Sequence, residues 1–169
     1  MDTLYENPPY PIALNLAGRS CVVVGGGRVG ARKTRGLIAV HALVTVISPA
    51  LCDELQSLAD EGVIRAQIKP YESGDIGALK PVLVFAATND PAVNRAVADE
   101  ARQCGALVNT TDNRTAADFH NMPSARRGNI TVAVSTRGNH PTLAKALAAR
   151  LAESITDGDV KAAATRSKP

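Results

Sequence analysis

The residues best suited to chemistry begin with a glycine-rich loop near the start of the chain. Gly25, Gly27 and Gly30 fit the pattern G-x-G-x-x-G, between an apolar run over 21–24 and a helical pattern over 29–39. In such a loop the first glycine permits a tight turn, the second lets a diphosphate approach the backbone, and the third lets helix and strand pack closely. Unpaired N–H groups at the start of the helix then face the diphosphate. The motif predicts a nucleotide cofactor; the alternative is a purely structural turn.

Asp112 is the acidic residue best placed for catalysis. It follows the last predicted parallel strand, over 107–109, at the edge of the sheet where open α/β folds bind their ligands. The residues beside it are polar and include no competing carboxylate. A carboxylate in this place could act as a general base beside a nicotinamide ring. It could also cap a turn or a helix, as aspartate often does.

The segment after the second predicted strand bears on the choice of dinucleotide. In the Rossmann pattern an acidic residue about 20 residues beyond the glycines binds the adenosine ribose. Here the strand ends Ile47-Ser48-Pro49-Ala50, with neither a carboxylate nor an arginine. The Ser48 hydroxyl, or backbone groups of Pro49 and Ala50, could bind a ribose hydroxyl. The residues by themselves therefore leave NAD and NADP open.

Four cations, Arg28, Arg32, Lys33 and Arg35, gather in the glycine loop and the first helical turns. Positive charges at the start of a helix oppose its dipole, at a cost of roughly a few tenths of a kcal/mol each. They are either solvated charges on an exposed face or ligands for phosphates or for a substrate that carries carboxylates. Further arginines follow in the C-terminal part of the chain, at Arg114, Arg126, Arg127 and Arg137.

The spacing of apolar residues predicts the framework that must position these groups. Near-continuous apolar runs alternate with helical patterns through the first two-thirds of the chain, as in a parallel sheet covered on both faces. The expected strands are 21–24, 43–47, 64–68, 82–86 and 107–109, and the expected helices are 29–39, 50–60 and 91–103. The alternation predicts an α/β fold, a Rossmann-like parallel sheet in a dinucleotide-binding domain over residues 1–112.

The pattern changes after Asp112 and predicts a small α+β region over residues 113–155. Two short strand patterns flank a turn at 127–129, and Pro141 suits the first turn of a helix. The apolar side chains of that helix recur every four residues, at Leu143, Leu147, Leu151 and Ile155. Because so short a region cannot enclose a core of its own, we expect this hairpin and helix to pack on a partner subunit. The last segment, 156–169, is expected to be a disordered tail.

Composition excludes several functional classes. The chain has 169 residues, a net charge of +3 and 3% aromatic residues, which argues against a nucleic-acid interface. Neither a signal peptide nor an apolar run near the ~20 residues of a membrane span is present, so a cytoplasmic protein is expected. Three widely spaced cysteines and three histidines lack the spacing of metal ligands, so no protein metal site is predicted. These residues are Cys21, Cys52, Cys104, His41, His120 and His140.

Several motifs beyond the glycine loop follow one another in order over residues 10–155. They are Leu14-Asn-Leu-Ala-Gly, Phe85-Ala-Ala-Thr-Asn-Asp, Val108-Asn-Thr-Thr-Asp112, Phe119 with Met122-Pro123-Ser124, and Val134-Ser-Thr-Arg-Gly138 with Pro141. Together they resemble the precorrin-2 dehydrogenase family, which includes bifunctional dehydrogenase–ferrochelatases and the N-terminal module of the siroheme synthases. The resemblance implies a homodimer that oxidises precorrin-2 to sirohydrochlorin with NAD. In some members Fe²⁺ is then inserted to give siroheme.

The resemblance also implies roles for individual residues. The family's essential aspartate falls on Asp112, as a proton acceptor. The implied cofactor-binding residues, together with the glycines of the loop, are Gly25, Gly27, Arg28, Val29, Gly30, Ser48, Pro49, Ala50 and Thr88. The residues expected to bind the tetrapyrrole, which carries eight carboxylates, are Arg114, His120, Ser135, Thr136 and Arg137.

Two departures from the family pattern lie in the last motif. Arg137 stands where a glycine is common, and Asn139-His140 stands where small residues are usual. Two other functions therefore stay open. One is a chelatase that acts chiefly on sirohydrochlorin, using Asp112 or His120 with the nitrogens of the macrocycle. The other is a nucleotide-sensing Rossmann module without catalysis, although such modules typically have an acidic residue at the end of the second strand.

Overall fold

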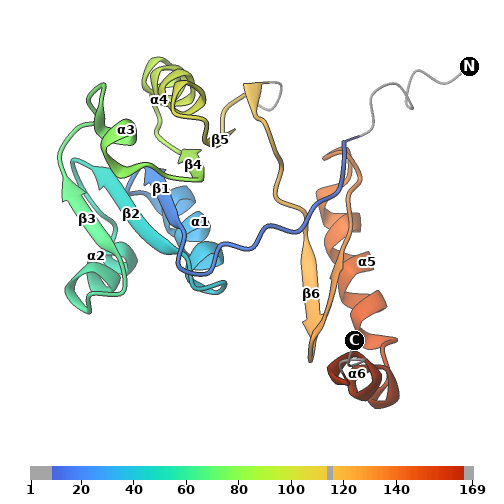
Figure 1. Ribbon diagram of the computed structural model, residues 1–169. Coiled ribbons are helices and arrows are strands. Elements are labelled where there is room, and N and C mark those ends of the chain that lie inside the picture. The colour runs from blue at the N-terminus through green and yellow to red at the C-terminus, as the bar shows by residue number, and fades with distance from the viewer. Residues whose placement is uncertain (1–8, 114–115, 166–169) are drawn as a thin grey trace, which may run out of the picture. The chain divides into compact units, whose positions relative to one another are not determined.

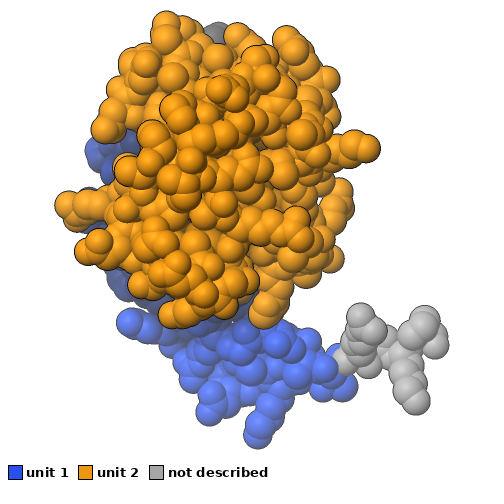
Figure 2. Space-filling view, turned by 90° about the vertical axis from the view of Figure 1, so that its left-hand side faces the viewer, with its two compact units in different colours: residues 1–11, 121–169 blue, residues 12–120 orange. Residues whose placement is uncertain are grey.

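The computed structural model describes residues 9–113 and 116–165, which fall into two compact units (Figure 2). The larger unit is Ile12–His120; the smaller combines Met1–Pro11 with Asn121–Pro169. The sequence-based boundary at residue 112 lies earlier than this division. The chain after the last parallel strand returns to the sheet, where the Asp118 N–H donates to the Val108 carbonyl (2.8 Å). That hydrogen bond keeps the intervening loop within the larger unit.

A five-stranded parallel sheet with the order β3-β2-β1-β4-β5 forms the centre of the larger unit (Figure 1). Its strands are β1 (Ser20–Val24), β2 (Leu43–Ser48), β3 (Arg65–Ile68), β4 (Leu83–Ala86) and β5 (Leu107–Thr110). The helices between them are α1 (Arg28–Ile38), α2 (Asp53–Asp60), α3 (Asp75–Leu79) and α4 (Pro91–Gln103). The strand order reverses between β1 and β4, which confirms the predicted Rossmann-like fold. Folds of this class bind their ligands at the carboxyl ends of the strands beside this reversal.

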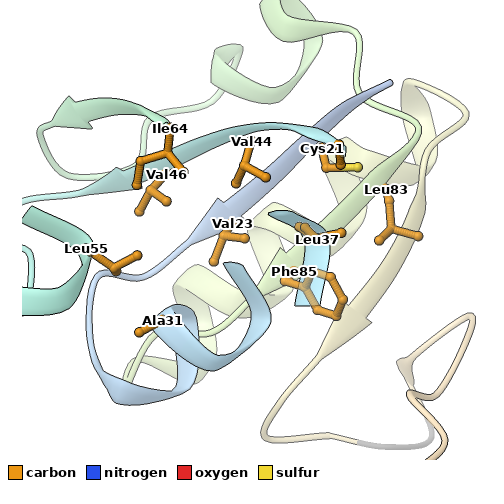
Figure 3. Close-up of a cluster of buried hydrophobic side chains, with 11 residues drawn as sticks. Cys21, Val23, Ala31, Leu37, Val44, Val46, Leu55, Ile64, Leu83 and Phe85 are labelled. Atoms are coloured by element: carbon orange, nitrogen blue, oxygen red, sulfur yellow. The ribbon is translucent and has the colours of Figure 1, made fainter. Parts of the chain in front are cut away.

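Helices cover both faces of this sheet, and this explains the continuous apolar runs of the central strands. Cys21 and Val23 of β1 face one core with residues of α1 and α2, shown in Figure 3. Val22 and Val24 face a second core with residues of α3 and α4. All four side chains are 0–1% exposed. Burial raises the pKa of the Cys21 thiol to about 11, so this cysteine is an inert part of the core.

The smaller unit contains an antiparallel hairpin and two helices. Strands β6 (Ser124–Arg127) and β7 (Ile130–Ala133) pair around a turn at Gly128, whose φ is +58°. The helices are α5 (Pro141–Glu153) and α6 (Asp157–Ala164). The predicted hairpin and the predicted helix start at Pro141 are both present. No helix in the described ranges is both long enough and apolar enough to cross a membrane.

The buried stripe of α5 differs from the predicted leucine stripe. Its buried side chains are the alanines Ala144, Ala148 and Ala152. Leu143 and Leu151 are 50% and 49% exposed. The small alanine side chains let α5 approach the hairpin closely, which leucines on that face would prevent. The leucines therefore form a second apolar face, which the chain itself leaves largely uncovered.

Helix α6 corrects the prediction of a disordered tail for most of residues 156–169. The Thr156 hydroxyl accepts from the Asp159 N–H (3.2 Å), and the Asp159 carboxylate accepts from the Thr156 N–H (2.8 Å). This capping box satisfies N–H groups at the start of the helix. Arg127 of the hairpin forms a salt bridge with Asp157 (2.9 Å). The sequence signal was the Thr-x-x-Asp spacing, followed by alanines with high helix propensity. Residues 166–169 lie outside the described part of the chain.

Candidate dinucleotide and catalytic site

Close packing requires glycine at two positions of the loop between β1 and α1 and at one position in the first turn of α1. A Cβ at Gly25, whose φ is +125°, would lie 2.3 Å from the Ala87 carbonyl oxygen. A Cβ at Gly26 would lie 2.0 Å from the carbonyl oxygen of Ala50, and one at Gly30 would lie 2.0 Å from that of Gly25. These distances are shorter than van der Waals contact. The loop can therefore lie against β4 and the end of β2 only if these residues lack side chains.

Gly27 differs from the other loop glycines because no atom lies within 4 Å of where its Cβ would be. It is the N-cap residue of α1, and no side chain caps the helix or places an acid in its first turn. The start of α1 therefore presents backbone N–H groups and the positive end of the helix dipole to an open space. An open glycine beside uncapped N–H groups is the arrangement that binds the diphosphate of a dinucleotide. NAD fits this part of the chain.

The end of β2 is tied to the glycine loop. The Cys52 N–H donates to the Gly26 carbonyl (2.8 Å), and the buried Ser48 hydroxyl donates to the Ala50 carbonyl (2.8 Å). The Ser48 hydroxyl proton is thus committed to the protein, and Ser48 could offer a ribose only its oxygen as an acceptor. Pro49 and Ala50 are exposed beside it. That these residues flank a ribose stays a prediction.

Thr88 follows β4 at the same edge of the sheet. Its hydroxyl donates to Asn94 Oδ1 (2.8 Å) or to the Asp90 carbonyl (3.1 Å), and its N–H also donates to Asn94 Oδ1 (3.1 Å). Asp90 in turn caps α4 by accepting from the Ala92 N–H (2.7 Å). Thr88 is therefore held in place at the carboxyl edge of the sheet.

Asp112 lies in the loop after β5, and both ends of this loop are anchored to the sheet. The Thr111 N–H donates to the Ala86 carbonyl (3.1 Å) at one end. At the other end the Asp118 carboxylate accepts from the Val108 N–H (2.9 Å) and from Arg102 Nε (3.2 Å). Asp112 itself is exposed, and within the described residues its carboxylate has no hydrogen-bond partner. It lines an open depression of about 220 Å³ that runs along α4 from Asn94 to Arg102.

Lys33 supports this loop from α1, a role that the sequence analysis did not find. Its Nζ donates to Asn109 Oδ1 (3.2 Å) and lies 4.7 Å from the centroid of the Phe85 ring. The Asn109 amide in turn donates to the Phe119 carbonyl (2.8 Å), and the rings of Phe85 and Phe119 pack edge to face. This Lys33–Asn109–Phe119 chain links β5, which precedes Asp112, to Phe119, which follows it. Burial, and secondarily the charge of Arg32, lowers the pKa of Lys33 to about 8.

The lowered pKa of Lys33 predicts that its contribution to stability rises in alkaline solution. Between about pH 8 and its ordinary value of 10.5, the unfolded chain binds the Lys33 proton more tightly than the folded chain does. The burial penalty on the charged lysine is therefore present below pH 8 and is relieved as the pH rises through this window. Urea unfolding of the wild type and Lys33→Met at pH 7.5 and 9.5 measures the effect. The free energy of unfolding of the wild type, relative to that of Lys33→Met, should be higher at pH 9.5 than at pH 7.5. A difference that does not change with pH would contradict the prediction.

The predicted substrate-binding residues fall in both units. His120 is exposed at the end of the larger unit, and Arg114 lies outside the described residues. Ser135, Thr136 and Arg137 form a turn before α5 in the smaller unit, where the Ser135 hydroxyl accepts from the Arg137 N–H (3.2 Å). Arg137 has a φ of +52°, which explains why a glycine suits this position better. Among the described residues no cluster of three or more His, Cys, Asp or Glu side chains could hold a metal.

Comparison with known proteins agrees with this geometry. A family model described as NAD(P)-binding matches residues 12–123, more than half of the chain. Siroheme synthases from Thioalkalivibrio sulfidiphilus and Nitrosomonas europaea are 40% and 42% identical over 142 and 143 residues. These matches cover 84% and 83% of this chain, but 29% and 30% of the relatives, so the chain spans about a third of their length.

A solved structure of SirC, a precorrin-2 dehydrogenase, is similar to most of this chain. It matches with a TM-score of 0.73 and 29% identity, covering 90% of this chain and 74% of SirC. The resemblance predicted from the motifs is thereby confirmed, and NAD is confirmed as the cofactor. This chain belongs to the NAD(P)-binding family whose model covers its glycine loop, its parallel sheet and the Asp112 loop.

Proposed function

We propose that this chain is an NAD-dependent dehydrogenase that oxidises precorrin-2 to sirohydrochlorin. The observation that carries the proposal is the position of Asp112, an exposed carboxylate on an anchored loop at the same sheet edge as the glycine loop. A nucleotide sensor would need the glycine loop but has no evident use for this carboxylate. The similarity to SirC over 74% of its length supports the same reaction.

The reaction removes one hydride and one proton from precorrin-2. NAD⁺, when bound at the glycine loop, would supply the acceptor for the hydride. Asp112 accepts the proton through a carboxylate oxygen, and its exposure lets it pass that proton on to water. Thr88 would hold the nicotinamide end of the dinucleotide and the open space at Gly27 its diphosphate, while the Lys33–Asn109–Phe119 chain keeps the Asp112 loop in place. Arg114, His120 and the Ser135–Arg137 turn are proposed to bind the carboxylates of the substrate.

An anaerobic assay with enzymatically generated precorrin-2 and NAD⁺ tests this function directly. We expect sirohydrochlorin to accumulate, as followed by its absorbance, with one NADH formed for each molecule produced. Fe²⁺ added after the oxidation tests chelation in a separate step. NAD⁺ binding without turnover would contradict the proposal and favour the nucleotide-sensing module. Iron insertion into supplied sirohydrochlorin, without turnover of precorrin-2, would favour the chelatase.

We also propose that the chain forms a homodimer through the leucine face of α5. Leu143 and Leu151 are about half exposed on the helix surface that the hairpin leaves uncovered. Two exposed leucines on the same helix face are unfavourable in water and suit contact with another apolar surface. The Ser135–Arg137 turn immediately precedes this helix. A second copy of the chain is the occupant that the family resemblance implies.

The double variant Leu143→Glu/Leu151→Glu is therefore expected to be a monomer. Both side chains are exposed within one chain, so the substitutions should leave the free energy of unfolding of the monomer nearly unchanged. Light scattering after gel filtration measures the mass, with the wild-type chain of 17.6 kDa expected at twice that value. Substitution of exposed Lys145→Glu on the same helix serves as the control for charge. A double variant that stays dimeric would place the interface elsewhere.

A further inference from the structure

Helix α1 carries a stripe of three arginines beside the glycine loop. Arg28, Arg32 and Arg35 stand at spacings of i, i+4 and i+7 and therefore share one face of the helix. Arg35 forms a salt bridge with Glu54 (2.5 Å), whereas Arg28 and Arg32 have no ion pair or hydrogen bond with any residue that the structure describes. Arg28 and Arg32 repel each other and oppose the helix dipole, so helix stability does not account for them.

The stripe faces an open cavity of about 450 Å³. The cavity is lined by Arg28, Val29, Arg32, Arg35, Cys52 and Glu54, so it joins the start of α1 to the start of α2. The hydrogen bond from Cys52 to Gly26 holds these two segments together (2.8 Å). The only carboxylate among the lining residues, Glu54, is already neutralised by Arg35. The free charge at this cavity is therefore positive.

The topology places this cavity at the adenosine half of a bound dinucleotide. Strand β2 lies on one side of β1, and β4 and β5 lie on the other. Thr88 and Asp112, the groups proposed for the nicotinamide end, follow β4 and β5. With the diphosphate at the start of α1, the adenosine half must extend toward the end of β2. The ribose then lies beside the β2–α2 segment, where the cavity opens.

We propose that Arg32, together with Arg28, forms a binding site for the 2′-phosphate of NADP⁺, so that the chain binds NADP⁺ as well as NAD⁺. Selection against NADP⁺ in this fold depends on a carboxylate at the end of β2, which repels the 2′-phosphate. Here β2 ends in Ser48, followed by Pro49 and Ala50, so this carboxylate is missing. Two arginines that have no partner among the described residues instead offer charge-assisted hydrogen bonds to a phosphate. The inference rests on the dinucleotide site alone and is independent of the tetrapyrrole substrate.

Titration calorimetry of the full chain with NAD⁺, NADP⁺, 5′-ADP and adenosine 2′,5′-bisphosphate tests the site without any turnover. We expect Kd values for NADP⁺ and NAD⁺ within about tenfold of each other, and tighter binding of the 2′,5′-bisphosphate than of 5′-ADP. Arg32→Gln should raise the Kd for NADP⁺ about tenfold or more while changing that for NAD⁺ less than about threefold. Arg65→Gln, which removes an exposed charge from β3, should change neither.

Three results would overturn the proposal. One is NADP⁺ binding about 100-fold weaker than NAD⁺ in the wild type. A second is an equal loss of both dinucleotides in Arg32→Gln, which would assign the arginine to the diphosphate. A third is no difference between the 2′,5′-bisphosphate and 5′-ADP. In each case NAD⁺ binding and precorrin-2 turnover by the wild-type chain would still support the proposed dehydrogenase. The two proposals can therefore fail separately.

Discussion

Replacing Asp112 with asparagine is expected to lower kcat for precorrin-2 oxidation by about 10²–10⁴-fold, the usual contribution of a general base. The substitution keeps the size of the side chain but removes the charge and most of the basicity. Because Asp112 is exposed and its carboxylate has no partner among the described residues, folding should be nearly unaffected. The Kd for NAD⁺ should also stay within about twofold, since the glycine loop is untouched. Steady-state kinetics, calorimetry and urea unfolding measure the three quantities.

Asp99→Asn is the matched control for Asp112→Asn. Asp99 lies on α4 and lines the same depression as Asp112, so its substitution removes the same charge from the same surface. Its salt bridge with Arg102 is long (3.8 Å) and exposed, and its loss should cost little. We expect Asp99→Asn to keep most of the activity. Similar activity in both variants, or an Asp112→Asn kcat within tenfold of the wild type, would remove Asp112 from the role of base.

The parts of the fold that sequence predicted best are those fixed by local pattern. The runs in β1 and β4 are apolar because both of their faces are buried, and Pro91 after Asp90 marks the start of α4. The start of α2 was placed too early, at residue 50. In the structure Cys52 donates its N–H to Gly26, and the helix begins only at Asp53. A contact between two loops fixes that boundary, and no local pattern encodes it.

The rest of the site depends on contacts between distant residues. Lys33 reaches Asn109 across 76 positions of sequence, and Phe85 and Asn109 meet because β4 and β5 pair in register. Nothing in the residues around Lys33 distinguishes it from the neighbouring arginines. The alanine face of α5 was missed for a related reason. Leucine periodicity indicates an apolar face, but it does not say whether that face contacts this chain or another surface.

Gly27→Ala is expected to separate cofactor binding from folding within the glycine loop. An added Cβ at Gly27 meets no protein atom within 4 Å, and the backbone φ of −86° suits alanine. The free energy of unfolding should therefore change by less than about 1 kcal/mol, the size of an N-cap effect. The new methyl group would occupy the space through which the diphosphate approaches the backbone. We expect the Kd for NAD⁺ to rise at least about tenfold, as measured by calorimetry.

Two other alanine substitutions give this prediction its controls. Gly30→Ala would place a Cβ 2.0 Å from the Gly25 carbonyl oxygen, so it should destabilise the fold by about 3 kcal/mol or more. Gly36→Ala, on the exposed side of α1 with no atom within 4 Å, should stabilise the helix by about 0.5–1 kcal/mol and leave NAD⁺ binding unchanged. If Gly27→Ala instead bound NAD⁺ normally, the diphosphate would not lie against Gly27. Because Gly27 is the loop glycine that protein packing does not require, its absence of a side chain is best explained by the ligand.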